Sequence, residues 1–217
     1  MSNFSALDAF RQHSFLITFP SEFYLYQRDE PINEVFLLET GLVKLTRSEN
    51  DGAEMIVGLR SSGRLLGAAA AVSKQNALFN AITVSPCTAY RLPINIFYDL
   101  IESVPDFSHY VTETISELQR EVIVRLSQIG LLDARSHLAH ILIEFSRGAT
   151  TQTDGELRLQ LPLSDIDLSK MLAIAPEHLS RLFRQLITDG IIRRKGGWTY
   201  ITDINLLKKE ADGKRGK

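Results

Sequence analysis

The chain has 217 residues, 44% of them hydrophobic and 23% charged, which is ordinary for a globular protein of one or two domains. Its single cysteine, Cys87, excludes an internal disulfide and a cysteine-rich metal cluster. No apolar run is long enough to span a membrane, and the first residues lack the pattern of a secretory signal. We therefore expect a cytoplasmic protein with no membrane partner.

The net charge of −2 is unevenly distributed along the chain. Residues 135–217 contain 14 Lys and Arg against 10 Asp and Glu, a balance of +4, whereas residues 1–134 carry −6. A phosphate-rich partner would therefore bind the C-terminal part of the chain.

Residues 15–92 alternate short runs rich in Val, Ile, Phe, Tyr, Leu and Thr with turn signals. The sequence Asn-Asp-Gly at 50–52 predicts a hairpin turn, because these residues accept positive φ. Many short strands at close spacing are typical of a β-barrel or a double-sheet roll. Residues 66–71 contain few β-branched side chains and are predicted to form a short helix within the roll. Residues 1–13 are predicted to be a helical or irregular lead-in.

Two helices are predicted next, over residues 94–103 and over about residues 107–131, with a break at Pro105. The longer helix carries an apolar stripe at alternating spacings of four and three, which is nearly a heptad seam. The stripe consists of Val111, Ile115, Leu118, Val122 and Ile129. Such a helix favours a homodimer about a two-fold axis. The alternative is that the stripe packs on the roll of its own chain.

A further helix is predicted over residues 134–146, with Asp133 as its N-cap and as the hinge that precedes it. A polar loop over residues 148–155 and a strand over residues 157–161 follow. The basic stretch that begins at Lys208 is predicted to be a frayed tail.

Residues 163–186 predict two short helices with a tight turn between them. Ser164 is suited to cap the first helix, because its hydroxyl accepts from a free backbone N–H of the first turn. Pro176 opens the second helix, since the N–H that it lacks would have no partner there. Gly190 is expected to end it, because glycine takes the left-handed conformation without strain. This pattern is typical of a helix-turn-helix whose second helix recognises DNA.

The outward face of the second helix is polar. Glu177, Ser180 and Arg181 are suited to base edges, since Arg binds guanine through two hydrogen bonds and Glu accepts from cytosine. Arg184 and His178 are expected to face phosphate. The alternative is an ordinary helical hairpin with a solvated charged face.

Residues 190–201 predict a β-hairpin, or wing, that turns at two consecutive glycines. Arg193, Arg194 and Lys195 are expected at its tip, where they suit phosphate oxygens. A basic wing beside a helix-turn-helix is more specific than either part alone, and it makes double-stranded DNA the expected partner.

With a β-roll, a long helix, a hinge and a winged helix-turn-helix in this order, the chain resembles the cAMP receptor protein/fumarate-nitrate reduction regulator (Crp/Fnr) family of bacterial transcription factors. The resemblance covers nearly the whole chain, and it is carried by GLVKL (41–45), DGAE (51–54), GRLLG (63–67), LDAR (132–135) and the segment 163–192. It implies an α+β protein with a cyclic-nucleotide-binding-type β-roll (1–106), a dimerisation helix (107–132) and a winged helix-turn-helix domain (133–217). It also implies a homodimer, with RNA polymerase as a partner. An enzyme is the rival interpretation, but the sequence shows no nucleophile–base pair, no phosphate-binding loop and no metal triad, so no enzymatic activity is expected.

The resemblance further implies a half-site. Glu177 matches the glutamate of both main branches, Arg181 the arginine that recognises guanine, and Ser180 the serine of the fumarate-nitrate reduction branch. Pro176 replaces the arginine of the cAMP receptor branch, so a palindrome of the TTGA type is expected. Ala173 stands where the family has a turn glycine.

The expected effector pocket departs from the family. Its residues are Gly67, Ala68, Ala69, Phe79 and Asn80. Ala68 replaces the glutamate for the ribose hydroxyl, and residues 79 and 80 replace the Arg-Ser pair for the cyclic phosphate. Without that charged partner cAMP is not expected to bind, and an iron–sulfur cluster is not expected because the N-terminal cysteines of that branch are absent.

The remaining alternatives for the effector are haem, a small organic acid, another apolar ligand, or none. Haem would need His109 and Cys87 as iron ligands. His137 and His140 have a metal-ligand spacing, but no third ligand is evident. In any of the ligand-dependent cases, DNA binding would be conditional on the effector.

Overall fold

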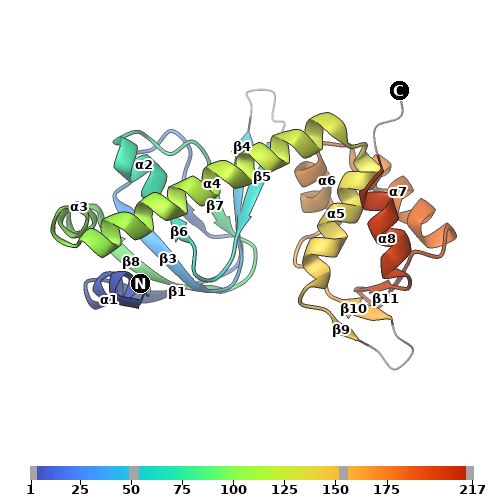
Figure 1. Ribbon diagram of the computed structural model, residues 1–217, viewed down its shortest axis with the longest axis horizontal. Coiled ribbons are helices and arrows are strands. Elements are labelled where there is room, and N and C mark those ends of the chain that lie inside the picture. The colour runs from blue at the N-terminus through green and yellow to red at the C-terminus, as the bar shows by residue number, and fades with distance from the viewer. Residues whose placement is uncertain (1–3, 49–53, 152–155, 214–217) are drawn as a thin grey trace. The chain divides into compact units, whose positions relative to one another are not determined.

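The computed structural model describes residues 4–48, 54–151 and 156–213 (Figure 1). They form two compact units, one ending at Glu121 and the other beginning at Val122. The change of unit falls inside one helix, α4, which spans Pro105–Leu131. No helix in these ranges is both long and apolar enough to cross a membrane.

The first unit is built on two four-stranded sheets, with the strand orders β1-β8-β3-β6 and β2-β7-β4-β5. All of their strand pairs are antiparallel, which confirms the predicted β-roll. The strands are β1 (Phe15–Phe19), β2 (Tyr24–Tyr26), β3 (Glu34–Thr40), β4 (Val43–Ser48), β5 (Glu54–Arg60), β6 (Leu65–Leu66), β7 (Asn80–Thr83) and β8 (Cys87–Pro93). The predicted turn at residues 50–52 lies outside the described residues, but β4 and β5, which flank it, pair with each other.

Three further helices belong to this unit: α1 (Phe4–Gln12), α2 (Ala68–Ser73) and α3 (Ile94–Ser103). The helix predicted within the roll is therefore present as α2. Gly67 precedes it with φ of 86°, in the left-handed region that favours glycine. A Cβ at this position would approach the carbonyl oxygen of Glu34 to 3.2 Å, so α2 can begin close to β3.

The core of the first unit includes the beginning of α4. Phe107 contacts the rings of Phe10 and Phe97, with ring centroids 6.0 and 5.7 Å apart. Val111 is only 3% exposed within the same cluster, and Ile115 packs against it. The assignment of Val111 to a dimer interface is therefore wrong, because its own chain already covers it.

The described side chains in the rest of the predicted stripe do not share one environment. Leu118 lines a cavity of the first unit. Val122 is 47% exposed, and its neighbours Ile123, Val124 and Leu126 are more than half exposed. The side chain of Ile129 lies outside the described residues.

The second unit combines helices with one four-stranded sheet of order β11-β12-β10-β9. After α4 its elements are α5 (Ala134–Ser146), β9 (Thr150–Thr151), β10 (Leu157–Leu159), α6 (Asp165–Leu172), α7 (Pro176–Thr188), β11 (Ile192–Lys195), β12 (Trp198–Ile201) and α8 (Ile204–Ala211). Asp133 caps α5 by accepting from the Ser136 backbone N–H at 2.8 Å, as predicted.

Two predictions for this unit were wrong. The stretch predicted as a polar loop contains strand β9, which pairs with β10. The stretch predicted as a frayed tail begins inside α8, which buries Leu207 and Ala211. The sequence pattern did not reveal this helix, because only two of its eight side chains, Leu207 and Ala211, are buried, and charged residues lie between them.

Candidate nucleic-acid interface and ligand cavity

Helices α6 and α7 form a helix-turn-helix with the predicted limits. The hydroxyl of Ser164 accepts from the Asp167 backbone N–H at 3.0 Å and so caps α6. Ala173 ends α6 with φ of 53° and ψ of 45°, a left-handed conformation that alanine rarely adopts. Pro176 is the first residue of α7, and Gly190 follows its end with φ of 70°.

The two helices bury their inner faces against each other and against the rest of the unit. Leu168 of α6 and Leu179 and Leu186 of α7 are at most 1% exposed. This burial fixes the rotation of α7 about its axis, because its apolar stripe must face inward. The opposite, polar face of α7 is thereby presented to solvent.

The exposed face of α7 carries the residues that were predicted to contact DNA. Glu177, Ser180, Arg181 and Arg184 are all exposed, whereas His178 is half-buried. The Arg184 Nη2 donates to the Ser180 Oγ at 3.4 Å. Within the described parts of the chain, the side chains of Glu177 and Arg181 make no hydrogen bond or ion pair. Their polar groups are therefore available to a partner.

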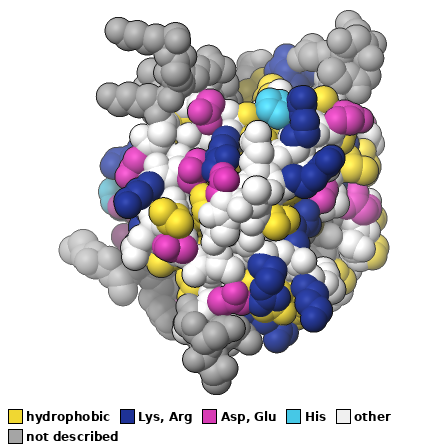
Figure 2. Space-filling view, turned by 90° about the vertical axis from the view of Figure 1, so that its right-hand side faces the viewer, with side chains coloured by type: hydrophobic (Ala, Val, Ile, Leu, Met, Phe, Trp, Pro, Cys, Tyr) yellow, Lys and Arg dark blue, Asp and Glu magenta, His cyan; other side chains and the backbone are white. Residues whose placement is uncertain are grey.

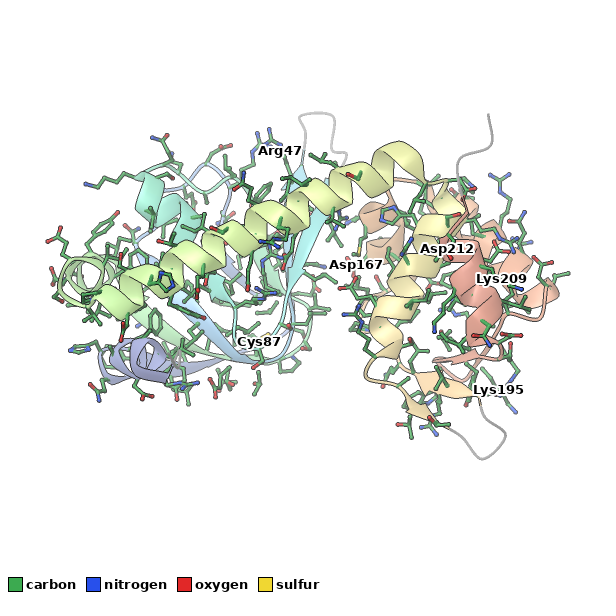
Figure 3. All side chains as sticks on the ribbon, viewed as in Figure 1. Arg47, Cys87, Asp167, Lys195, Lys209 and Asp212 are labelled. Carbon is green, nitrogen blue, oxygen red and sulfur yellow. The ribbon has the colours of Figure 1, made fainter. Side chains whose placement is uncertain are left out.

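Strands β11 and β12 form the predicted wing. Gly196 and Gly197 connect them with φ of 58° and 79°, which is the pair of positive values that a tight hairpin turn requires. Lys195 pairs with Trp198 next to this turn and lies at the end of the hairpin (Figure 3). In Figure 2, which shows this side of the second unit, basic side chains lie near the top beside a histidine, toward the lower edge and at the left.

The two wing arginines lie below the tip rather than at it. Arg194 donates through both Nη atoms to the carboxylate of Asp165 at 3.0 and 2.9 Å, and its guanidinium lies 4.3 Å from the ring centre of Phe183. Arg193 pairs with Glu156 and lies 3.9 Å from the ring centre of Tyr200. Both guanidinium groups therefore already have a carboxylate partner within the unit, which the sequence alone did not predict.

The first unit contains a cavity of about 570 Å³ between the roll and α4. Its wall includes four of the five predicted pocket residues, Gly67, Ala68, Ala69 and Phe79. Asn80 does not line it, because its side chain is used within the roll. The Asn80 Oδ1 accepts from the Arg28 backbone N–H at 2.8 Å, and its Nδ2 donates to the Thr46 Oγ1 at 3.3 Å.

The cavity also contains polar residues that the sequence analysis missed. Arg60, at the end of β5, and Tyr26, in β2, both line it. Burial raises the pKa of Tyr26 to about 12, although the neighbouring Arg60 acts in the opposite direction. The alternation of β5 could have placed Arg60 on one face of its sheet, but not on the wall of a cavity.

Comparison with known proteins explains why these two sites occur in one chain. The family described as "Cyclic nucleotide-binding domain" matches residues 16–104, and the family described as "Crp-like helix-turn-helix domain" matches residues 136–210. The chain belongs to the Crp/Fnr family. It is accordingly a DNA-binding transcription regulator.

Individual Crp/Fnr proteins are similar over most of the chain. An anaerobic regulatory protein of Pasteurella multocida is 24% identical over 84% of this chain and 67% of its own. A CRP-like cAMP-activated global transcriptional regulator of Mycobacterium tuberculosis is 20% identical over 95% of this chain and 92% of its own. The structure of FixK2 from Bradyrhizobium japonicum has a TM-score of 0.78 at 19% identity, covering 90% of this chain and 96% of that one, which shows the shared fold.

The cavity of this Crp/Fnr protein lacks the side chains with which the family resemblance would expect a cyclic nucleotide to be bound. Ala68 is 3% exposed at the position of the expected glutamate, and it offers no oxygen to a ribose hydroxyl. Phe79 lines the wall without a charge, and Asn80 is turned away. The cation that is present, Arg60, comes from a different strand.

The cavity does not bring together the iron ligands that were expected for haem. Among the described residues that line it, none is a histidine, cysteine or methionine. His109 has 74% of its side chain exposed and pairs with Glu113 at 3.1 Å. Cys87 is buried in the roll (Figure 3), where its thiol donates to the carbonyl oxygens of Leu42 and Ser85. Neither candidate iron ligand therefore belongs to the cavity.

Proposed function

We propose that this Crp/Fnr protein binds, as a homodimer, to a palindrome of two TTGA-type half-sites in the major groove. The observation that carries the proposal is the exposed face of α7, where Glu177 and Arg181 have no partner among the described residues. An exposed arginine without a partner loses no internal interaction when it binds guanine. Ser180, between them, completes the set of residues that would contact bases.

Other residues would position the protein on the phosphate backbone. Arg184 and His178 lie on α7, and Lys195 at the wing tip has no ion pair within the described residues. Arg193 and Arg194 would contact phosphate only by exchanging their carboxylates for it. Such contacts add affinity on every sequence and give no specificity by themselves.

The homodimer would use the exposed apolar part of α4. Val122, Ile123 and Leu126 are 47%, 56% and 64% exposed. Leu126 lies four residues after Val122 and three after Ile123, so it neighbours both on the surface of the helix. Covering these side chains by a second copy would remove apolar surface from water. Two-fold symmetry would then present two copies of α7 to two half-sites.

We further propose that DNA binding does not depend on cAMP, that the protein acts in the cytoplasm together with RNA polymerase, and that it catalyses no reaction. A cavity of about 570 Å³ favours a second candidate function, in which DNA binding is conditional on another ligand. The lining residues argue against cAMP as that ligand, for the reasons given above.

The test is fluorescence anisotropy of purified protein on a labelled TTGA…TCAA palindrome and on a scrambled duplex, at several stated salt concentrations. Specific binding without any ligand supports the proposal, and specific binding that requires cAMP contradicts it. Arg181→Ala is expected to weaken binding by about 1–3 kcal/mol and to relax specificity at one base pair. Lys195→Ala is the matched control, and it should weaken binding equally on all sequences. A uniform loss for both variants would contradict the assignment of Arg181.

A further inference from the structure

The wall of the cavity contains one buried cation. Arg60 is the last residue of β5, and its side chain is only 11% exposed. The guanidinium lies over Gly58, where an added Cβ would be 3.2 Å from the Arg60 Nη1. A cation buried to this degree requires an anionic partner to offset its lost hydration.

Arg60 has such a partner, but some of its N–H groups make no hydrogen bond to the described residues. Its Nη1 donates to the Leu59 carbonyl oxygen at 2.6 Å and pairs with the Glu121 carboxylate at 3.2 Å. Within the described ranges, Nε and Nη2 make no hydrogen bond or ion pair. A guanidinium has five N–H groups in a planar fork, so the unused ones can bind a further anionic group.

Tyr26 supplies a neutral donor to the same part of the wall. Its pKa, raised to about 12 by burial, keeps the phenol protonated at neutral pH. A protonated hydroxyl beside a guanidinium can donate to an anion but cannot itself neutralise the cation. The two groups together therefore match one anionic group of a ligand.

Most of the remaining wall is apolar. Leu45, Leu66, Phe79, Ile115 and Leu118 represent this part of the lining. The acidic residue of the wall, Asp29, has 76% of its side chain exposed and pairs with Arg28 at 3.1 Å. A ligand that fills the cavity must accordingly bury a largely apolar body.

We propose that the cavity binds an organic anion with one negatively charged group and an apolar body, and that this anion replaces Glu121 on Arg60. The exchange leaves no unpaired carboxylate, because Glu121 also pairs with Arg64 at 3.0 Å. Arg64 in turn holds Glu117, one turn earlier in α4, at 2.5 Å. The released part of α4 therefore stays attached to the roll through Arg64.

The exchange has a consequence for regulation that rests on the proposed DNA-binding function. Glu121 is the last residue of the first unit, and Val122 begins the unit that contains the helix-turn-helix. An anion on Arg60 would therefore change how α4 is held at the point where the chain enters the DNA-binding unit. The affinity for DNA is expected to respond to it.

The probe is 8-anilino-1-naphthalenesulfonate, a fluorescent monoanion with an apolar body, compared with N-phenyl-1-naphthylamine, which lacks the sulfonate. Arg60→Gln is expected to raise the dissociation constant of the sulfonate dye about tenfold and to leave that of the neutral dye unchanged, since it removes one charged hydrogen-bond partner. Glu121→Gln is expected to lower the constant for the sulfonate dye, because it removes the internal competitor. Ala69→Phe, on the cavity wall, is expected to weaken both dyes.

Two variants serve as matched controls, and circular dichroism verifies that every variant is folded. Glu117→Gln removes a carboxylate from the same face of α4, and Arg91→Gln removes a cation that pairs with Glu34 elsewhere on the roll. Neither should change the binding of either dye. Equal losses of both dyes in Arg60→Gln, no gain in Glu121→Gln, or displacement of the sulfonate dye by micromolar cAMP would each overturn the proposal.

The regulatory part is tested separately. Dye binding is measured without DNA, so its failure leaves the proposed recognition of the palindrome untouched, and failure to bind the palindrome leaves the dye result untouched. If both hold, the sulfonate dye should shift the affinity for the palindrome in the unmodified protein and not in Arg60→Gln. If the affinity for the palindrome is the same with and without the sulfonate dye, the link between the cavity and DNA binding is overturned.

Discussion

Three arginines show that the role of a residue in this protein is set by what surrounds it. Arg181 is exposed and has no partner among the described residues, so its guanidinium is available to DNA. Arg60 is buried, and Glu121 neutralises it from α4. Arg135 joins three helices, donating to Asp189 at 2.6 Å and to Glu210 at 2.7 Å. The same chemical group is thus assigned to the proposed DNA recognition, to the proposed ligand binding and to the observed contacts that hold the second unit together.

His137 predicts a pH dependence of stability at this scale. The residue is 6% exposed in α5 and is neutral, because burial, Arg125 and His140 together lower its pKa to about 4. The unfolded chain binds a proton near the ordinary value of about 6.5, so below that pH it binds more protons than the folded chain. The stability that comes from a neutral His137 is fully present above pH 6.5 and is lost as the pH falls toward 4. Between pH 7.5 and 5 the loss is about 2 kcal/mol.

The free energy of unfolding of the second unit, measured by urea titration at several pH values, tests this effect. Its tryptophan, Trp198, lies in β12 and provides a fluorescence signal for that unit. His137→Gln removes the titrating group and should flatten the slope between pH 7.5 and 5. His140→Gln is the matched control on the next turn, and it should keep most of the slope. A slope that is identical in both variants would assign the effect to other groups.

The wing shows what limited the sequence analysis at the scale of an element. The hairpin, its glycine turn and its three basic residues were predicted correctly, because each follows from a local pattern of side chains. The acids that engage Arg193 and Arg194 lie 37 and 29 residues earlier in the chain, and no local pattern pairs them. Tertiary pairing therefore decided which wing cations are free.

The surroundings of the long helix α4 were likewise not predictable from local sequence. Its periodicity predicted an apolar stripe, and the structure has one, but periodicity does not say what covers a stripe. Val111 is buried in the core of its own unit, whereas Val122 is 47% exposed. The cavity was only partly predicted. Helix α2 followed from the scarcity of β-branched residues at 66–71, and the pocket residues followed from the family resemblance, whereas Arg60 required knowledge of how β5 faces α4.

The ion pair between Arg194 and Asp165 yields a prediction for the DNA interface. Asp165→Asn removes the carboxylate that holds the guanidinium, so Arg194 becomes available to phosphate. Binding should tighten severalfold on specific and scrambled DNA alike, because phosphate contacts do not depend on sequence. The plot of log affinity against log salt concentration should also steepen by about one unit.

Asp167→Asn is the matched control for this change, since it removes the same charge from the same turn of α6, while Asp165 remains paired with Arg194. If both variants tighten DNA binding equally, the gain comes from the lower negative charge of the unit and not from the release of Arg194.

At the scale of the whole molecule, the first unit offers a ligand cavity and the second a DNA-binding face, and α4 runs through both. Each unit has its own hydrophobic core, and the chain passes from one unit to the other within α4. The proposed association of two chains would use the exposed apolar side chains of that helix, Val122, Ile123 and Leu126. Testing that surface therefore tests how the protein is assembled.

The double variant Ile123→Glu/Leu126→Glu should make the protein monomeric in analytical ultracentrifugation, because two carboxylates from each chain would be buried at the proposed two-fold axis. Its affinity for the full palindrome should fall on the order of 100-fold, while that for a single half-site stays the same, since only the linkage of two binding events is lost. Val111→Ala is the control: it should destabilise the first unit by roughly 2 kcal/mol without changing association. A double variant that remains a dimer would show that α4 is not the interface, and the symmetry of the DNA site would then have to arise elsewhere.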